Sequence, residues 1–236
     1  EMSTRDWSSD VCSSDLYGYE HHGMITLDKA FRVSCNNSFA QAALLIGDKK
    51  LCQTAEDFGF NDNFLFRDLV VENSRYPTEN RNDFEIAWSG AGQSQVAATP
   101  MHMCMVAAAI ANDGTMMEPR LLRQVVSPAG MQRLGYTSKV YTQACTPELA
   151  AQVEEYMIDV VKNGTGKSAA VEGLTIAGKT GSAESSLDGR YVTHGWFVGY
   201  IDDPAYPYAV SVFVEEGGSG GKAAAPLAHE IFRWLT

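Results

Sequence analysis

The sequence predicts an α+β domain in which helices flank an antiparallel sheet. Three observations support this fold class: apolar residues recur at helical spacing through the first half, two Thr-Pro pairs open capped helices at Thr99 and Thr146, and three strand-like runs follow one another near the C-terminus. Short turns separate these runs, so consecutive strands are expected to pair antiparallel. With 236 residues, 45% of them hydrophobic, the chain has enough apolar material for one large domain.

The first half of the chain is expected to be helical up to a long irregular segment. Apolar residues fall at helical spacing over 27–31 and 39–46, on either side of a Ser-Cys-Asn corner at 34–36, and Gly47 ends the second run. Residues 60–95 are rich in Asn, Gly and Ser and keep no sustained period. We therefore predict two short helices followed by a long excursion over the surface.

The second half contains clearer start and stop signals. Thr99 and Thr146 are expected to be N-caps with Pro at the first helical position, and the first of these helices is expected to be wholly buried, with its methionines in the core. Residues 121–143 alternate as a β-hairpin does around a Ser-Pro-Ala-Gly turn. Strands are then expected at "LTIAGKTG", "THGWFVGYI" and "YPYAVSVFVEE", and a short helix over 223–235 closes the chain.

Charge and cysteine content exclude several classes of protein. The formal net charge of −11 argues against nucleic acid and anionic membrane surfaces as general partners, because those partners need clustered Lys and Arg. The five cysteines lie far apart and form no Cys-x-x-Cys pair, so neither a disulfide framework nor a zinc site is predicted. The longest strongly apolar stretch, 103–111, is far shorter than the roughly 20 residues that cross a bilayer.

Residues 1–16 do not have the pattern of the start of a fold. They repeat Ser-Ser-Asp and show neither helical nor strand periodicity. The segment resembles translated sequencing-adapter DNA joined to a truncated reading frame, so we expect 1–16 to be spurious and the domain to begin near Tyr17. Residues 17–236 are then expected to form part of a domain whose N-terminal portion, together with any membrane anchor, lies upstream.

Two tripeptides contain the residues best suited to chemistry. One is the Ser-Cys-Asn corner at 34–36, and the other is Lys-Thr-Gly at 179–181, where an apolar strand meets a segment rich in Ser and Glu. Together with "GQSQVAATPMHMCMVAAAIANDG" and "THGWFVGYIDD", they resemble the penicillin-binding protein transpeptidase domains of the serine penicillin-recognising acyltransferases, over nearly all of 17–236. The resemblance implies a β-lactamase-like or transpeptidase-like fold that is N-terminally truncated, and a cleft in which the two tripeptides meet.

The resemblance also implies roles for the Lys-Thr-Gly strand toward a peptide that ends in a D-alanyl-D-alanine carboxylate. Lys179 supplies positive charge, Thr180 donates a hydrogen bond to the carboxylate, and Gly181 lets the peptide backbone approach closely. The backbone N–H of Ser182 is expected to be one donor of an oxyanion hole. No metal or organic cofactor is implied.

The same resemblance assigns Ser34 to relay a proton to the leaving amine and Asn36 to hold the substrate amide and orient the catalytic lysine. The acylated serine of the family belongs to a Ser-x-x-Lys element upstream of this corner, and no such element precedes Ser34. The one literal match, Ser219 to Lys222, follows the last strand and is predicted to be a glycine-rich loop. We therefore expect the parent protein to be a serine-type D,D-transpeptidase and this chain, which lacks the nucleophile, to be inactive.

The intact form is expected to cross-link peptidoglycan stem peptides through an acyl-serine, to bind β-lactams, and to work at the extracytoplasmic face of a bacterial cytoplasmic membrane. Two alternatives stay open: a β-lactamase or β-lactam-sensor domain, and a non-catalytic cell-wall-binding module. A nucleotide-binding interpretation of "GTGKS" at 164–168 is set aside, because Val161 stands where a P-loop needs glycine and a helix, not a strand, precedes it. His194 is expected to have an ordinary strand-edge role.

Overall fold

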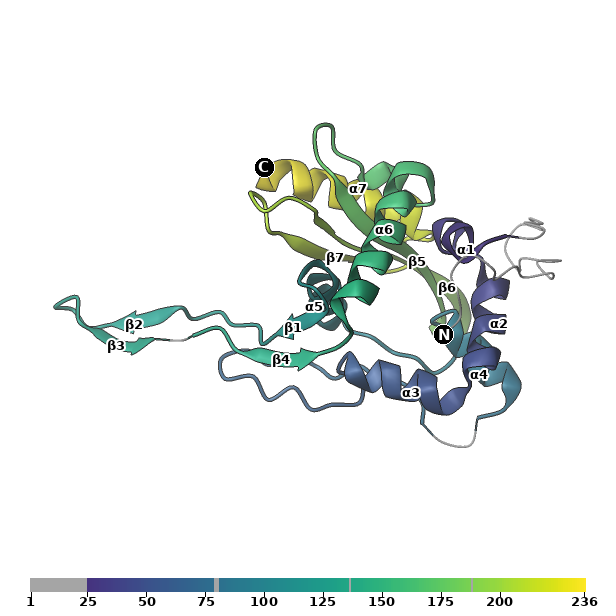
Figure 1. Ribbon diagram of the computed structural model, residues 1–236, viewed down its shortest axis with the longest axis horizontal. Helices are drawn as coiled ribbons and strands as arrows, with labels where there is room; N and C mark the ends of the chain where they lie inside the picture. The colour runs from purple at the N-terminus through teal and green to yellow at the C-terminus, as the bar shows by residue number, and fades with distance from the viewer. Residues whose placement is uncertain (1–24, 79–80, 136, 188) are drawn as a thin grey trace.

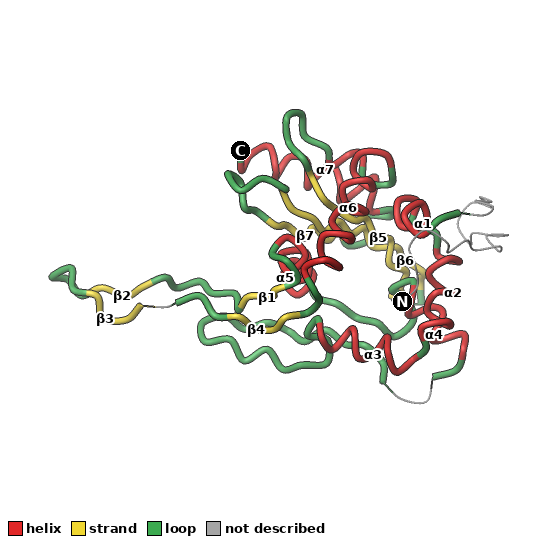
Figure 2. The backbone as a smooth tube through the Cα atoms, viewed as in Figure 1, coloured by secondary structure: helices red, strands yellow, loops and turns green. Residues whose placement is uncertain are grey.

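The computed structural model describes residues 25–78, 81–135, 137–187 and 189–236 (Figure 1). The predicted interpretation of 1–16 lies outside these residues. Three strands form the central antiparallel sheet in the order β5-β6-β7, and helices lie on both of its faces, as the α+β prediction requires (Figure 2). The strands are β5 (Ile176–Leu187), β6 (Arg190–Ile201) and β7 (Ala209–Val214).

Alternate residues of the sheet enter two different hydrophobic cores. On one face, Phe197 packs with Phe232 of α7 (Gly220–Leu235). On the other face, Tyr200 packs with residues of α5 (Pro100–Ala111) and α6 (Pro147–Asn163). This period of two is what a strand buried on both faces requires. The sheet is therefore held between α7 and the α5–α6 pair, and in the described part of the chain β5 has no strand partner on the edge opposite β6.

The predicted helix pair around the Ser-Cys-Asn corner is present as α1 (Leu27–Val33) and α2 (Asn36–Ile46). Ser34 ends α1 in the left-handed conformation, with φ 56° and ψ 49°. The Cys35 backbone N–H donates to the Ala30 carbonyl at 2.9 Å, so the chain reverses within two residues. Because α1 packs against α6, and α6 against β5, the corner lies close to the edge of the sheet.

The segment 60–95 is not a continuous surface excursion, and that prediction was wrong. Phe64 is buried in a core beneath α5, and α4 (Asp83–Gly90) begins within the segment. A capping box starts this helix, because the Asn82 side chain accepts from the Glu85 backbone N–H and the Glu85 side chain accepts from the Asn82 backbone N–H. The Asn-x-x-Glu spacing was the signal that could have predicted α4.

Three further helix predictions are corrected or completed. A helix that periodicity did not predict, α3 (Asp48–Asp57), begins directly after Gly47, and it contains no buried residue. The α5 helix has the predicted Thr99 cap, but Met101 is 36% exposed, so the helix is not wholly buried. The closing helix, α7, begins at Gly220 and not at 223, so Ser219 to Lys222 form its N-terminal turn and not a loop.

The predicted hairpin over 121–143 is present as β2 (Gln124–Val126) and β3 (Gln132–Gly135), and a further strand before it, β1 (Thr115–Met117), was not predicted. β1 pairs with β4 (Val140–Gln143), and β2 pairs with β3 beyond them. Figure 1 shows that β2 and β3 project away from the body of the molecule. A short 3-10 helix, η1 (Lys167–Ala169), follows α6.

The described residues contain neither a membrane-spanning helix nor a disulfide. No helix among them is both long and apolar enough to span a membrane. The four cysteines among them form no disulfide with one another.

Candidate functional site

The Lys-Thr-Gly tripeptide lies on the open edge of β5. The Thr180 carbonyl accepts from Lys179 Nζ at 2.9 Å, and the Ser182 carbonyl accepts from Gln93 Nε2 at 3.0 Å. Both carbonyls therefore point away from β6. In an antiparallel strand the N–H and C=O of one residue point to the same side, so the Ser182 N–H is also directed to the open edge.

The structure brings the two predicted tripeptides into direct contact. Lys179 Nζ donates to Ser34 Oγ across 145 residues of sequence. The Phe31 ring centroid lies 5.7 Å from the same nitrogen. Burial lowers the pKa of Lys179 to about 8. The two printed acceptors of the ammonium are a hydroxyl and a carbonyl, and among the described residues no carboxylate lies within ion-pair distance of it. The site therefore contains a cation without a local counter-ion.

Sequence reasoning missed Thr165, whose Oγ1 lies 2.6 Å from Thr180 Oγ1. The loop after α6 brings it there, and its backbone N–H donates to the Arg32 carbonyl at 3.3 Å. A Cβ on Gly164 would lie 2.4 Å from that same carbonyl, so the approach requires glycine. The available signal was the Gly-Thr-Gly sequence, which is better explained by this close packing than by phosphate binding.

A cavity of about 340 Å³ opens along this edge. It is bounded by 179–183 of β5, by 91–93, 96 and 98 in the loop after α4, and by Phe60, Met103, Trp196 and Val198. Met103, predicted to pack in the core, therefore contributes to the cavity wall. Ser34 and Asn36 are not among the lining residues; Ser34 reaches the site through Lys179, and Asn36 occupies the first position of α2.

The start of α7 is packed against the same strand. The Gly220 backbone N–H donates to Ser182 Oγ at 3.3 Å. A Cβ on Gly220 would lie 2.3 Å from the Gly181 carbonyl oxygen and 2.2 Å from the Trp196 carbonyl oxygen, so no larger residue fits without displacing the helix. The glycines of the Ser-Gly-Gly-Lys match thus serve helix-to-sheet packing. At Gly181 a Cβ would lie 3.2 Å from Trp196 Cβ, a tight contact that a small shift of the Trp196 side chain could relieve.

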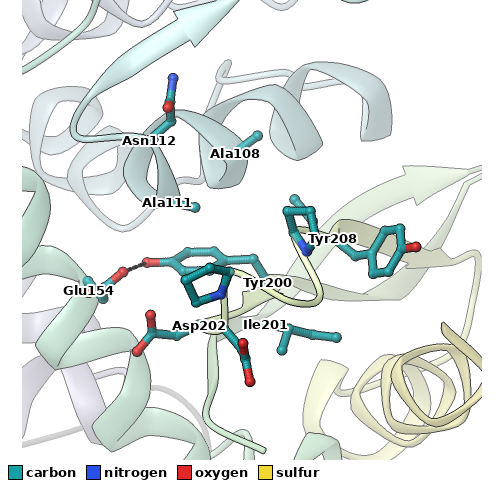
Figure 3. A pocket seen from close by; sticks show the side chains of 12 residues that line it. Ala108, Ala111, Asn112, Glu154, Tyr200, Ile201, Asp202 and Tyr208 are labelled. Carbon is teal, nitrogen blue, oxygen red and sulfur yellow. Dashed lines mark hydrogen bonds between the residues drawn. The ribbon is translucent and has the colours of Figure 1, made fainter. Parts of the chain in front are cut away.

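A second cavity, of about 310 Å³, lies at the C-terminal end of α5 (Figure 3). Tyr200 crosses it and donates to Glu154 Oε2 at 2.7 Å. Burial, and then the hydrogen bond to Glu154, raise the pKa of Tyr200. None of the predicted site residues lines this cavity.

The histidine on β6 makes two hydrogen-bond contacts with neighbouring segments. His194 Nε2 lies 2.7 Å from Ser185 Oγ, and its Nδ1 accepts from the Glu216 backbone N–H at 3.2 Å. Within the described ranges, no group of three or more His, Cys, Asp or Glu side chains could hold a metal ion.

Comparison with known proteins gives the same picture. The family described as penicillin binding protein transpeptidase domain matches residues 3–233. The chain is 33% identical over 210 residues to the peptidoglycan D,D-transpeptidase PbpA of Mycolicibacterium smegmatis, a match that covers 86% of this chain and 42% of the relative.

Solved structures resemble the chain closely. The crystal structure of PBPA from Mycobacterium tuberculosis has a TM-score of 0.86 at 28% identity and covers 98% of this chain and 57% of the solved one. The penicillin G acyl-enzyme complex of the same protein has a TM-score of 0.77 at 30% identity and covers 92% and 48%. The chain spans between 34% and 43% of the length of the first curated relatives. With the family match over nearly its whole length, the chain belongs to the penicillin-binding protein transpeptidase domain family.

Proposed function

We propose that the open edge of β5 binds the terminal carboxylate of a D-alanyl-D-alanine stem peptide, or the corresponding carboxylate of a β-lactam. The peptide lies along β5 as an added strand, with main-chain hydrogen bonds to the outward-facing groups of Thr180 and Ser182. The parent protein would be a peptidoglycan D,D-transpeptidase that acts through an acyl-serine, and this domain would supply the carboxylate-binding side of its cleft.

The electrostatics of the strand support this proposal. Lys179 is a cation with neutral hydrogen-bond partners, so an incoming carboxylate would provide its counter-ion. Thr165 is proposed as a positioning residue: when it donates to Thr180 Oγ1, the Thr180 proton is free to point at the carboxylate. The outward Ser182 N–H is proposed as an oxyanion-hole donor, where the loss of one donor typically reduces the rate about 100–1,000-fold.

The Ser-Cys-Asn corner at 34–36 is proposed to assist departure of the leaving group. Ser34, in contact with Lys179, would pass a proton to the departing amine, and Asn36 would hold the substrate amide. The contact between Lys179 and Ser34 is the single observation that carries the proposal, because it joins the two motifs at one point.

The direct experiment is calorimetric titration of this chain with diacetyl-L-Lys-D-Ala-D-Ala. The C-terminal amide of the same peptide is the matched control, because it removes only the charge. A charge-assisted hydrogen bond contributes about 1.5–3 kcal/mol, so the amide should bind about 10-fold to 100-fold more weakly. Equal affinity of acid and amide would refute carboxylate recognition.

Two other functions are separated by a second experiment. A fluorescent penicillin adduct that survives denaturation, on a protein with this cleft and a Ser-x-x-Lys element, would exclude a non-catalytic wall-binding module. Rapid hydrolysis of that adduct would identify a β-lactamase, whereas a stable adduct together with transfer of the peptide to an amine acceptor supports the transpeptidase. The proposed location is the extracytoplasmic face of a bacterial membrane, and the proposed partners are peptidoglycan stem peptides.

A further inference from the structure

The hairpin arm, defined here as residues 119–139, differs in charge from the rest of the chain. It contains four basic residues and no Asp or Glu, whereas the remainder of the sequence contains 14 basic and 29 acidic residues. At its base Lys139 pairs with Glu118, and Arg120 donates to Ser138 Oγ. Arg123, next to the first strand of the tip, is exposed. The arm is thus a basic projection from an acidic domain.

The arm also exposes apolar side chains along its whole length. Figure 1 shows β2 and β3 extending away from the central sheet and the helices that flank it. Six large apolar residues of the arm have exposed fractions between 42% and 72%: Leu121, Leu122, Val125, Val126, Met131 and Leu134. Their exposure on a two-stranded ribbon means that no other element in the described part of the chain covers either face.

The strand edges of the arm are open as well. β2 and β3 pair only with each other among the described residues, so each has an outer edge of unpaired N–H and C=O groups. An isolated two-stranded hairpin is marginally stable in water, and such edges accept an added strand readily.

We propose that the hairpin arm binds an acidic, extended segment of another protein by strand addition. The backbone edge would give pairing, the exposed valines and leucines would give apolar contact, and the basic side chains would select an acidic partner. The proposal goes beyond the proposed function, because it concerns a surface remote from the β5 cleft.

Two other occupants fit the observations less well. A second copy of this chain would bring two all-basic arms together, and like charges repel. A lipid bilayer would leave the unpaired edge groups without partners in hydrocarbon, where open sheet edges do not occur. Positive edge charges can also serve only to prevent aggregation. That role predicts no saturable binding of an acidic strand-forming peptide, so the test below separates it from strand addition.

The test uses the full chain and a synthetic 12-residue peptide that alternates Glu and Val. Fluorescence anisotropy should detect saturable binding, and amide exchange should slow at residues 124–126 or 132–135. Three probes are compared with it: the Lys-Val peptide, the Glu-Val peptide with N-methyl groups on alternate residues, and phosphatidylglycerol vesicles. Two variants are measured in parallel, R120E/R123E and, as a charge-matched control, K167E/K222E outside the arm.

Strand addition predicts that R120E/R123E weakens Glu-Val binding at least about tenfold and that K167E/K222E changes it less than about twofold, because the proposed peptide contacts the arm and not the rest of the domain. It also predicts that N-methylation abolishes binding. Equal binding of the Lys-Val peptide, insensitivity to N-methylation, or arm-dependent binding to vesicles in place of the peptide would each overturn the proposal. Unchanged affinity of R120E/R123E for the D-Ala-D-Ala peptide shows that the β5 cleft is a separate site.

Discussion

The pKa of Lys179 makes a quantitative prediction about the pH dependence of stability. Burial lowers this pKa from 10.5 to about 8 in the folded chain. Between these two values the unfolded chain binds more protons than the folded chain, so the free energy of unfolding must rise with pH across that window. Below the lower value the cost of burying the ammonium is fully present.

The magnitude follows from the two pKa values. Integrating the proton linkage between about pH 7.5 and about pH 9.5 gives wild-type protein a gain of about 2 kcal/mol relative to Lys179→Met, in which the titrating group is absent. Taking the difference between the two proteins removes the contribution of every other titrating group, including the tyrosines. The measurement is urea unfolding followed by tryptophan fluorescence at both pH values.

The control is Lys222→Met, which removes one positive charge from an exposed position at the start of α7. If the free energy of unfolding rises equally in wild type and Lys179→Met between the two pH values, burial does not destabilise the Lys179 ammonium. The proposal that this cation lacks a counter-ion until a carboxylate binds is then wrong. A gain confined to the wild type and to Lys222→Met supports it.

Three further predictions follow from individual contacts. Thr165→Val removes a hydroxyl hydrogen bond worth about 1 kcal/mol, so calorimetry should show about fivefold weaker binding of the D-Ala-D-Ala peptide. Thr165→Ser should restore the affinity. Unaltered affinity of the valine variant would contradict the positioning role. Gly220→Ala places a methyl group about 2.2 Å from a backbone oxygen, so it should lower the free energy of unfolding by more than about 2 kcal/mol. A melting temperature equal to that of wild type would show that α7 is not packed against β6 in this way. Asn82→Ala removes the α4 capping box and should cost about 1 kcal/mol in urea unfolding, and a cost no larger than that of an exposed control such as Lys49→Ala would argue against the cap.

The elements that sequence predicted well are those whose signals are local. Thr99 and Thr146 each accept a hydrogen bond from a backbone N–H three residues later, as a cap does. The three strands near the C-terminus were predicted because their period and turns lie within a few residues. Where the stabilising contacts are distant, the prediction failed: Phe64 belongs to a core assembled from α5 and β1 residues, and nothing in its own neighbourhood indicates burial.

The same contrast between local and distant signals applies to the candidate site. Residue types at 34–36 and 179–181 predicted which side chains would meet, and Lys179 does contact Ser34. The contact of Thr165 with Thr180 could not be predicted, because it depends on how the loop after α6 packs against β5. The Gly-Gly pair at 220 and 221 was interpreted from helix propensity alone, which disfavours a helix start there. Tertiary packing decides otherwise, since a Cβ at 220 would meet two carbonyl oxygens of the sheet.

The central claim is that the strand end at 179–182 and the corner at 34–36 form one carboxylate-binding cleft. It is tested most directly by ¹⁵N-¹H NMR titration of the chain with diacetyl-L-Lys-D-Ala-D-Ala. We predict the largest amide shifts at Thr180 and Ser182, with smaller shifts at 34–36, and much smaller shifts at all of these residues with the peptide amide at the same concentration. Saturable shifts centred on Tyr200 and the cavity of Figure 3, with the Lys-Thr-Gly strand unaffected, would contradict it.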